Sequence, residues 1–138
     1  MSHKTIQDAM TSDPKAIAPT TTAEDAARTM RTEDVGSLPI VEGDRLVGVV
    51  TDRDLTIRVL AEGKTGQTTV GEIASKDVVT IDPLQTLEEA ARLMAEHQLR
   101  RLPVVEEDGK LVGIVAQADL AKLGHDALTG ETVQQISK

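Results

Sequence analysis

Short apolar runs and amphipathic stretches follow one another twice along the chain. Residues 38–41 and 45–50 are mostly apolar runs rich in Val, Leu and Ile, and the polar residues 42–44 separate them. Such a pair of runs across a short polar turn predicts a β-hairpin. In the second half, the turn between two similar runs contains Asp108-Gly109, a dipeptide that favours tight hairpin turns.

An amphipathic helix is expected before each hairpin. Thr22-x-x-Asp25 and Thr86-x-x-Glu89 match the capping box, in which two side chains satisfy free backbone N–H groups at the start of a helix. The second helix carries apolar residues at helical spacing, namely Leu87, Ala90, Ala91 and Met94. This stripe indicates a face that is buried in the core.

Further short elements are expected at equivalent places in the two halves. They are helical turns at Ile6 to Met10 and Val70 to Ala74, brief strands at Lys15 to Ile17 and Asp77 to Ile81, and closing helices at about Asp52 to Ala61 and Gln117 to Leu123. Polar residues with Gly63 and Gly66 follow the first closing helix and predict a linker.

The two halves are an internal repeat. Residues 8–42 share 13 identities with residues 72–106, and residues 44–55 share 6 with residues 109–120, which makes 19 in 47 positions. Chance at average composition would give about three. We therefore divide the chain into a first repeat (6–62), a linker (63–69), a second repeat (70–123) and a C-terminal tail (124–138).

Each repeat has the order helix, strand, helix, hairpin, helix, which predicts a mixed α+β protein of the α/β type. A three-stranded sheet with helices on one face leaves its other surface uncovered, and the second copy can supply the cover.

Composition narrows the classes of function. The net charge is −8 and there are no aromatic residues, so the chain lacks the cationic patches and stacking platforms that nucleic acids require. It has no cysteine, which rules out disulfides and thiolate metal sites. No apolar run approaches the roughly 18 residues of a membrane span. We expect a cytoplasmic protein with no nucleic-acid or membrane partner. A core without aromatics also makes self-association reasonable.

The most distinctive chemistry lies where the last strand of each repeat runs into the closing helix. In residues 48–55, Thr51 and Asp54 are three apart, so both side chains can face the free N–H groups of the first helical turn or a ligand above them. The T-x-x-D spacing also matches a capping box, which leaves a purely structural role open. In residues 113–120 the aspartate recurs as Asp119, but Ala116 replaces the threonine. This recurrence without the threonine favours a ligand-binding role for the carboxylates.

These tandem motifs resemble a known family. Leu38-Pro39 and Leu102-Pro103, each followed by Leu-Val-Gly, two apolar residues and an aspartate at a helix start, are similar to a pair of CBS domains, the Bateman module. The resemblance covers about residues 6–123. It implies two βαββα repeats packed with pseudo-twofold symmetry through their sheets, and clefts that bind AMP, ADP, ATP, NAD or S-adenosylmethionine. It also implies a homodimer.

The resemblance assigns roles to the junction residues. Asp54 and Asp119 would each hold the two ribose hydroxyls, which suits a carboxylate that accepts two hydrogen bonds from a diol. Thr51 would contact ribose or phosphate, whereas Ala116 leaves the second cleft without that hydroxyl.

The resemblance also places adenine and the phosphates. Adenine would sit against the short first strand of the opposite repeat and the segment before its Leu-Pro pair. For the Thr51/Asp54 cleft these residues are Ser75, Val79, Thr80 and Leu99, and for the Asp119 cleft they are Thr11, Ala16, Ile17, Val35 and Ser37. Arg100 and Arg101 would reach phosphates, and the guanidinium geometry suits them. We expect the Thr51/Asp54/Arg101 cleft to be the better site. The two arginines remain equally open to interpretation as surface charges or as ion-pair partners in a dimer.

Three functions compete. The first is a stand-alone sensor that binds an adenine nucleotide and signals to an unknown protein partner through a change of conformation or dimer packing. The second is a structural or protein-interaction module with weak or empty clefts. The third is an enzyme, which we do not expect because no nucleophile–base pair and no metal-ligand cluster is visible. His3, His97 and His125 show no metal-ligand spacing, and no cofactor is required.

Overall fold

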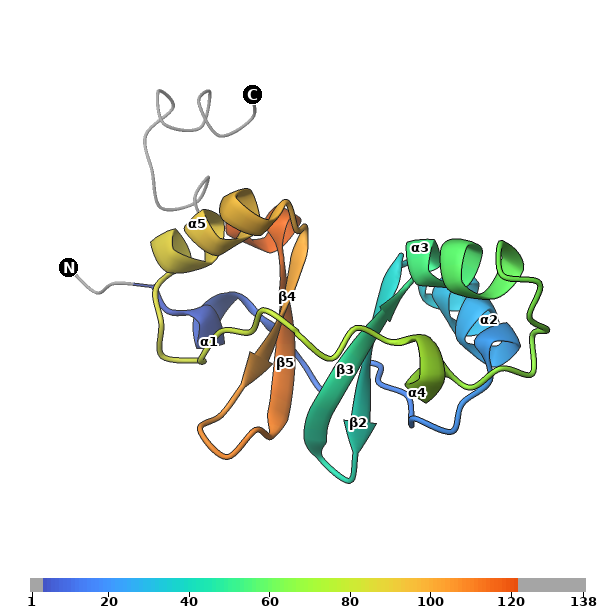
Figure 1. Cartoon of the computed structure of the whole chain (residues 1–138). Coiled ribbons are helices and arrows are strands. Elements are labelled where there is room, and N and C mark those ends of the chain that lie inside the picture. The colour runs from blue at the N-terminus through green and yellow to red at the C-terminus, as the bar shows by residue number, and fades with distance from the viewer. Residues whose placement is uncertain (1–3, 122–138) are drawn as a thin grey trace. The chain divides into compact units, whose positions relative to one another are not determined.

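The computed structural model describes residues 4–121 of the chain (Figure 1). These residues form two compact units. The first-repeat unit consists of residues 15–78 and 109–111. The second-repeat unit consists of residues 4–14, 79–108 and 112–121. Both mix helices and strands, as the sequence predicts.

A two-stranded hairpin is the centre of the first-repeat unit. Strands β2 (Ser37–Glu42) and β3 (Arg45–Thr51) pair antiparallel, and Ser37 lies opposite Thr51. Helix α2 (Ala23–Glu33) and helix α4 (Val70–Ile73) contribute apolar side chains to the same core. The chain leaves β3 directly into α3 (Asp52–Asp54) and then η1 (Leu55–Leu60). The predicted hairpin is therefore confirmed.

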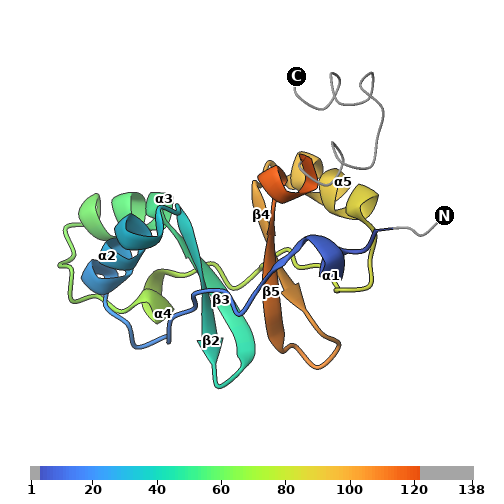
Figure 2. The same cartoon turned by 180° about the vertical axis from the view of Figure 1, so that it is seen from behind.

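The second-repeat unit contains a three-stranded sheet in the order β1-β5-β4. Its elements are α1 (Ile6–Ala9), β1 (Thr11–Ser12), α5 (Leu87–His97), β4 (Arg101–Val105) and β5 (Leu111–Ala116), and residues 117–121 are helical. The view from behind shows α1 and β5 clearly (Figure 2). Leu123, the predicted end of the closing helix, and the C-terminal tail lie outside the described residues.

The two compact units do not coincide with the two sequence repeats, because the first segment of each repeat packs with the other one. Ile6 of α1 is fully buried among Leu102, Val104 and Val115 of the second-repeat unit. Val70 of α4 is likewise fully buried in the core of the first-repeat unit. Each hydrophobic core is thus completed by a segment exchanged between the repeats.

Two glycines explain how the exchanged segments reach the sheet. A Cβ at Gly48 would lie 3.0 Å from the carbonyl oxygen of Ser75, and one at Gly113 would lie 2.9 Å from that of Thr11. Both distances are shorter than at least nine in ten real Cβ contacts. The backbone of the exchanged segment therefore passes directly against β3 or β5 at the residue without a side chain.

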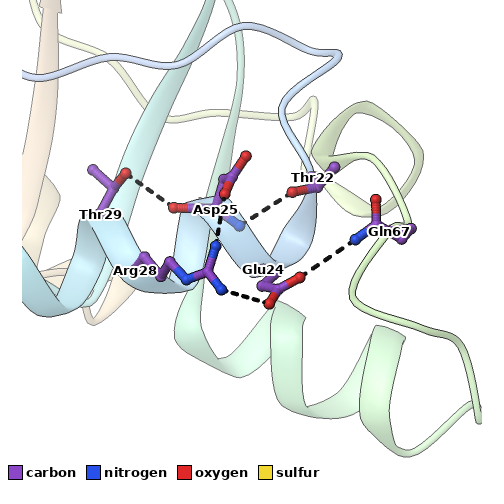
Figure 3. A network of polar contacts seen from close by, with 6 residues as sticks. All are labelled: Thr22, Glu24, Asp25, Arg28, Thr29 and Gln67. Atoms are coloured by element: carbon purple, nitrogen blue, oxygen red, sulfur yellow. Dashed lines mark hydrogen bonds and ion pairs between the residues drawn. The ribbon is translucent and has the colours of Figure 1, made fainter.

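The linker is bound to the first-repeat unit. The carbonyls of Gly66 and Thr68 accept hydrogen bonds from the N–H groups of Glu24 (3.0 Å) and Ala23 (2.7 Å), the first residues of α2. Gln67 also donates to the Glu24 carboxylate over 3.3 Å (Figure 3). The linker thereby satisfies N–H groups that have no partner within the helix.

Of the two predicted capping boxes, one forms completely and the other only in part. Thr86 and Glu89 form the complete reciprocal box at the start of α5. At α2, Thr22 accepts from the Asp25 N–H over 3.2 Å, but the Asp25 carboxylate contacts Arg28 instead of closing the box (Figure 3). The sequence signal thus located both helix starts, while the side-chain partners depended on neighbouring charges.

Three predicted elements differ in the structure. The predicted closing helix of the first repeat is α-helical only at Asp52–Asp54 and continues as the π-helix η1, where the Ala61 N–H donates to the Thr56 carbonyl. The predicted strands at Lys15 to Ile17 and Asp77 to Ile81 reduce to single bridges at Ile17 and Ile81. Pro19 and Pro83 follow two residues later; since proline has no N–H, the pairing ends there.

Candidate functional site: two strand-to-helix junctions

Thr51 and Asp54 form a reciprocal cap where β3 enters the helix. The Asp54 N–H donates to Thr51 Oγ1 over 3.1 Å, and the Thr51 N–H donates to Asp54 Oδ2 over 2.9 Å. The Asp54 side chain is 15% exposed. The capping box that the T-x-x-D spacing indicates is therefore confirmed.

Asp119 makes half of the same cap. The Ala116 N–H donates to Asp119 Oδ2 over 2.8 Å. Ala116 has no hydroxyl, so its side chain cannot accept the reciprocal hydrogen bond from the Asp119 N–H. Asp119 therefore has a structural role even without a threonine partner, and its ligand-binding role stays a prediction. A carboxylate three residues into a helix can satisfy the preceding N–H by itself.

Both carboxylates keep acceptor capacity beyond the cap. A carboxylate offers about four lone-pair sites on its two oxygens, and the cap uses only Oδ2 in each case. Asp54 Oδ1 lies 3.8 Å from Nε of Arg58, an ion pair that is longer than a hydrogen bond. Each junction therefore retains a carboxylate oxygen that can accept hydrogen bonds, next to the end of a strand.

In each unit, the residue before the first hairpin strand is hydrogen-bonded to the first residue of the helix at the junction. The Gly36 carbonyl accepts from the Asp52 N–H (2.9 Å), and the Arg100 carbonyl accepts from the Gln117 N–H (2.7 Å). Exposed Arg100 and Arg101 lie in the same unit as Asp119, and the backbone of Arg100 is hydrogen-bonded to its junction.

The exchanged segments flank both junctions. Ser75 exchanges two backbone hydrogen bonds with Val49, two residues before Thr51. Thr11 pairs with Ile114, two residues before Ala116. The structure thus brings Ser75 into one unit with Thr51 and Asp54, as the sequence predicted, and places Thr11 in one unit with Asp119.

The other predicted contacts join residues of different units. Ala16, Ile17, Val35 and Ser37 belong to the first-repeat unit, whereas Val79, Thr80, Leu99, Arg100 and Arg101 belong to the second-repeat unit. The grouping of Asp54 with Val79, Thr80, Leu99 and the two arginines therefore stays a prediction, as does that of Asp119 with Ala16, Ile17, Val35 and Ser37. Ile17 is buried in the core of its own unit.

Arg58 is a junction residue that the sequence reasoning missed. Its guanidinium donates to the carbonyl of Ile73 over 3.1 Å in addition to the ion pair with Asp54. The four-residue spacing of Asp54 and Arg58, which favours side-chain pairing on a helix, was the available signal.

Within 4–121, no group of three or more His, Cys, Asp or Glu side chains is arranged to hold a metal ion. No helix in this part of the chain has the length and apolar character needed to cross a bilayer.

The hairpin units with exchanged first segments and capped strand-to-helix junctions define a tandem-repeat α+β module. The protein-family model of the CBS domain matches residues 6–61 and again residues 70–126. The chain belongs to the CBS domain family, as the tandem motifs predict.

Relatives match over most of their own length. The chain is 45% identical over 116 residues to the CBS domain-containing protein YhcV of Bacillus subtilis, covering 84% of this chain and 82% of YhcV. It is 41% identical over 120 residues to Hypoxic response protein 1 of Mycobacterium tuberculosis, covering 86% and 83%.

Solved structures share the fold. The crystal structure of Hypoxic Response Protein I with two coordinated zinc ions superposes with a TM-score of 0.79 at 39% identity, covering 87% of this chain and 98% of that one. The structure of CBSX2 of Arabidopsis thaliana in complex with AMP gives a TM-score of 0.81 at 32% identity, covering 91% and 98%.

Proposed function

We propose that this protein is a regulatory module that binds an adenosine-containing nucleotide at its strand-to-helix junctions. The observation that carries the proposal is the AMP complex of CBSX2, a protein with the same fold across nearly its whole length. The proposed ligands are AMP, ADP, ATP, NAD and S-adenosylmethionine, all of which present an adenosine with a ribose diol.

The geometry of the first junction supports a role in ribose binding. Asp54 Oδ1 retains lone pairs after the cap is made, and a diol can donate two hydrogen bonds to one carboxylate. Thr51 Oγ1 accepts from the Asp54 N–H, so its own hydroxyl hydrogen stays available to a ribose or phosphate oxygen. Ser75, which lies beside β3, can supply a further polar contact.

The second junction supports phosphate binding. Arg100 and Arg101 are exposed and are bonded through the Arg100 backbone to the helix start that carries Asp119. A guanidinium binds phosphate oxygens with two parallel N–H donors.

Signal output would follow from a ligand that prefers one arrangement of the protein over another. We propose a homodimer in the cytoplasm whose packing or conformation responds to the nucleotide, and a separate protein partner that receives the signal. The module would regulate and not catalyse.

A structural or protein-interaction module with empty sites is the second candidate. One specific observation favours it: both aspartates already have a structural task, since each satisfies a backbone N–H at a helix start. This task requires no ligand.

Calorimetric titration and thermal unfolding with these five adenosine compounds separate the two candidates. A ligand at 100 times its dissociation constant should raise the free energy of unfolding by about 2.7 kcal/mol. Asp54→Asn keeps an oxygen that can accept from the Thr51 N–H but removes the charge, so it should weaken binding about 10- to 100-fold. Asp52→Asn is the matched control, because this neighbouring exposed aspartate loses the same charge. No response to any of the five compounds would leave the interaction module as the function.

A further inference from the structure

Arg58 connects two parts of the first junction that are distant in sequence. Its Nη1 donates to the carbonyl of Ile73 over 3.1 Å, and its Nε lies 3.8 Å from Asp54 Oδ1. Arg58 lies on η1, immediately after the residues that form the cap. One side chain therefore contacts both the carboxylate and the end of α4.

The contact at Ile73 holds the segment that flanks the site. The last carbonyls of a helix have no partner within it, and Ile73 is the final residue of α4. Two residues later, Ser75 exchanges hydrogen bonds with Val49 on β3. Fixing the Ile73 carbonyl therefore restricts where Ser75 lies relative to the carboxylate of Asp54.

The contact at Asp54 orients the free oxygen. Asp54 Oδ2 is held by the Thr51 N–H, and the guanidinium stands beside Oδ1 at a distance too long for a hydrogen bond. The lone pairs of Oδ1 thus remain available, while the positive charge favours one rotamer of an ionised carboxylate. A preorganised acceptor loses less conformational entropy when a ligand binds.

The second repeat shows that the cap itself does not need this arginine. At the offset of 65 residues, Asp54 corresponds to Asp119 and Arg58 to Leu123. Asp119 nevertheless satisfies the Ala116 N–H over 2.8 Å. Arg58 also lies in the π-helix of residues 55–60, a rare conformation that is often found at functional sites. Arg58 is therefore an addition specific to the first junction.

We propose that Arg58 is a positioning residue that makes the Asp54 junction selective for nucleotides with an intact ribose diol. It acts through Asp54, whose free oxygen it orients, and through Ile73, which fixes the Ser75 segment. The proposal rests on the proposed function, because the selectivity is that of the same nucleotide site.

The test compares Arg58→Leu, which copies the second repeat, with Arg53→Leu as the control. Arg53 is an exposed residue on α3, and its replacement by leucine removes an equal charge close to the site. AMP and 2′-deoxy-AMP are titrated calorimetrically into each variant. Arg58→Leu should weaken AMP binding about five- to twentyfold, and 2′-deoxy-AMP binding less than about twofold. Arg53→Leu should change both by less than about twofold.

Arg58→Lys gives the conservative comparison. Lysine keeps the charge near Asp54. Its single ammonium group lacks the rigid fork of donors with which the guanidinium contacts both the carboxylate and the Ile73 carbonyl. It should restore part of the AMP affinity lost in Arg58→Leu and part of the discrimination against 2′-deoxy-AMP.

Amide hydrogen exchange without ligand separates this proposal from the proposed function. The Ala74 and Ser75 amides, which are hydrogen-bonded to the Val70 and Val49 carbonyls, should exchange faster in Arg58→Leu. Faster exchange with unchanged AMP affinity, or equal losses for AMP and 2′-deoxy-AMP, would overturn the positioning role while the nucleotide site stands. If the wild-type protein binds neither nucleotide, both proposals fail, even where the exchange result shows that Arg58 restrains α4.

Discussion

The two strand-to-helix junctions share one framework and differ in chemistry. In both, a carboxylate accepts from the N–H of the last strand residue, and the carbonyl before the first hairpin strand accepts from the first helical N–H. The first junction adds the hydroxyl of Thr51 and the guanidinium of Arg58. The second has Ala116 and Leu123 at these positions but carries Arg100 and Arg101 where the first has Gly36 and Ser37.

This comparison shows which features belong to the fold and which remain available for binding. A carboxylate that caps both junctions explains its own recurrence, so the repeated aspartate alone says little about ligands. The residues that differ between the repeats carry more information. They give the first junction a hydroxyl and a guanidinium beside its carboxylate, and they give the second junction two guanidinium groups suited to phosphates.

The largest expected effect concerns the exchange of first segments. Ile6→Ala should lower the free energy of unfolding by about 2–5 kcal/mol, because Ile6 is fully buried. Its counterpart Val70→Ala removes fewer carbons and should cost about 1–3 kcal/mol. Denaturant unfolding measures both values.

Amide exchange then shows which unit each residue supports. Ile6→Ala should accelerate exchange in β4 and β5, and Val70→Ala should accelerate it in β2 and β3. The opposite assignment, with Ile6→Ala loosening β2 and β3, would mean that each repeat completes its own core.

A smaller effect is expected from exchanging the junction residues. Thr51→Ala removes the acceptor of the Asp54 N–H and should destabilise the protein by about 1 kcal/mol. Ala116→Thr supplies the missing hydroxyl beside Asp119 and should stabilise it by up to about 1 kcal/mol. Thermal unfolding of the two variants and of the double variant measures these changes. A loss of stability in Ala116→Thr would show that the second junction cannot accommodate the complete box.

The smallest effect is a pH dependence confined to the second-repeat unit. Hydrogen bonds from the Gln85 side chain, then from the Thr86 backbone and hydroxyl, lower the pKa of Glu89 below its ordinary value. A carboxyl group whose pKa is lower in the folded state adds stability above its unfolded pKa of about 4.3 and loses it as the pH falls through the folded value. Acid unfolding below about pH 4.3 should therefore be shallower in Glu89→Gln. An identical acid transition in both proteins would contradict this assignment.

Local features of the fold followed from the sequence. The hairpins, the helix starts at Thr22 and Thr86, and the repeat itself were predicted from spacing and turn residues, because these depend on neighbours within a few positions. The family motifs likewise identified Thr51, Asp54 and Asp119 as the junction residues. The cap at Asp119 and the contacts of Arg58 were not predicted, since each depends on side-chain geometry that the spacing alone leaves open.

The sequence by itself determined that two similar α+β units would form and that each would carry an acidic residue at a helix start. Only the tertiary structure decided which segments complete each core. Ile6 and Val70 have the same local surroundings in either pairing, because a buried apolar side chain gains the same transfer free energy in any well-packed core. The choice of partner depends on contacts between distant parts of the chain, such as those of Ile6 with Leu102 and Val115, which local patterns do not encode. Arg58 acquires its position for the same reason, since Ile73 lies 15 residues away and is brought to it only by the packing of α4.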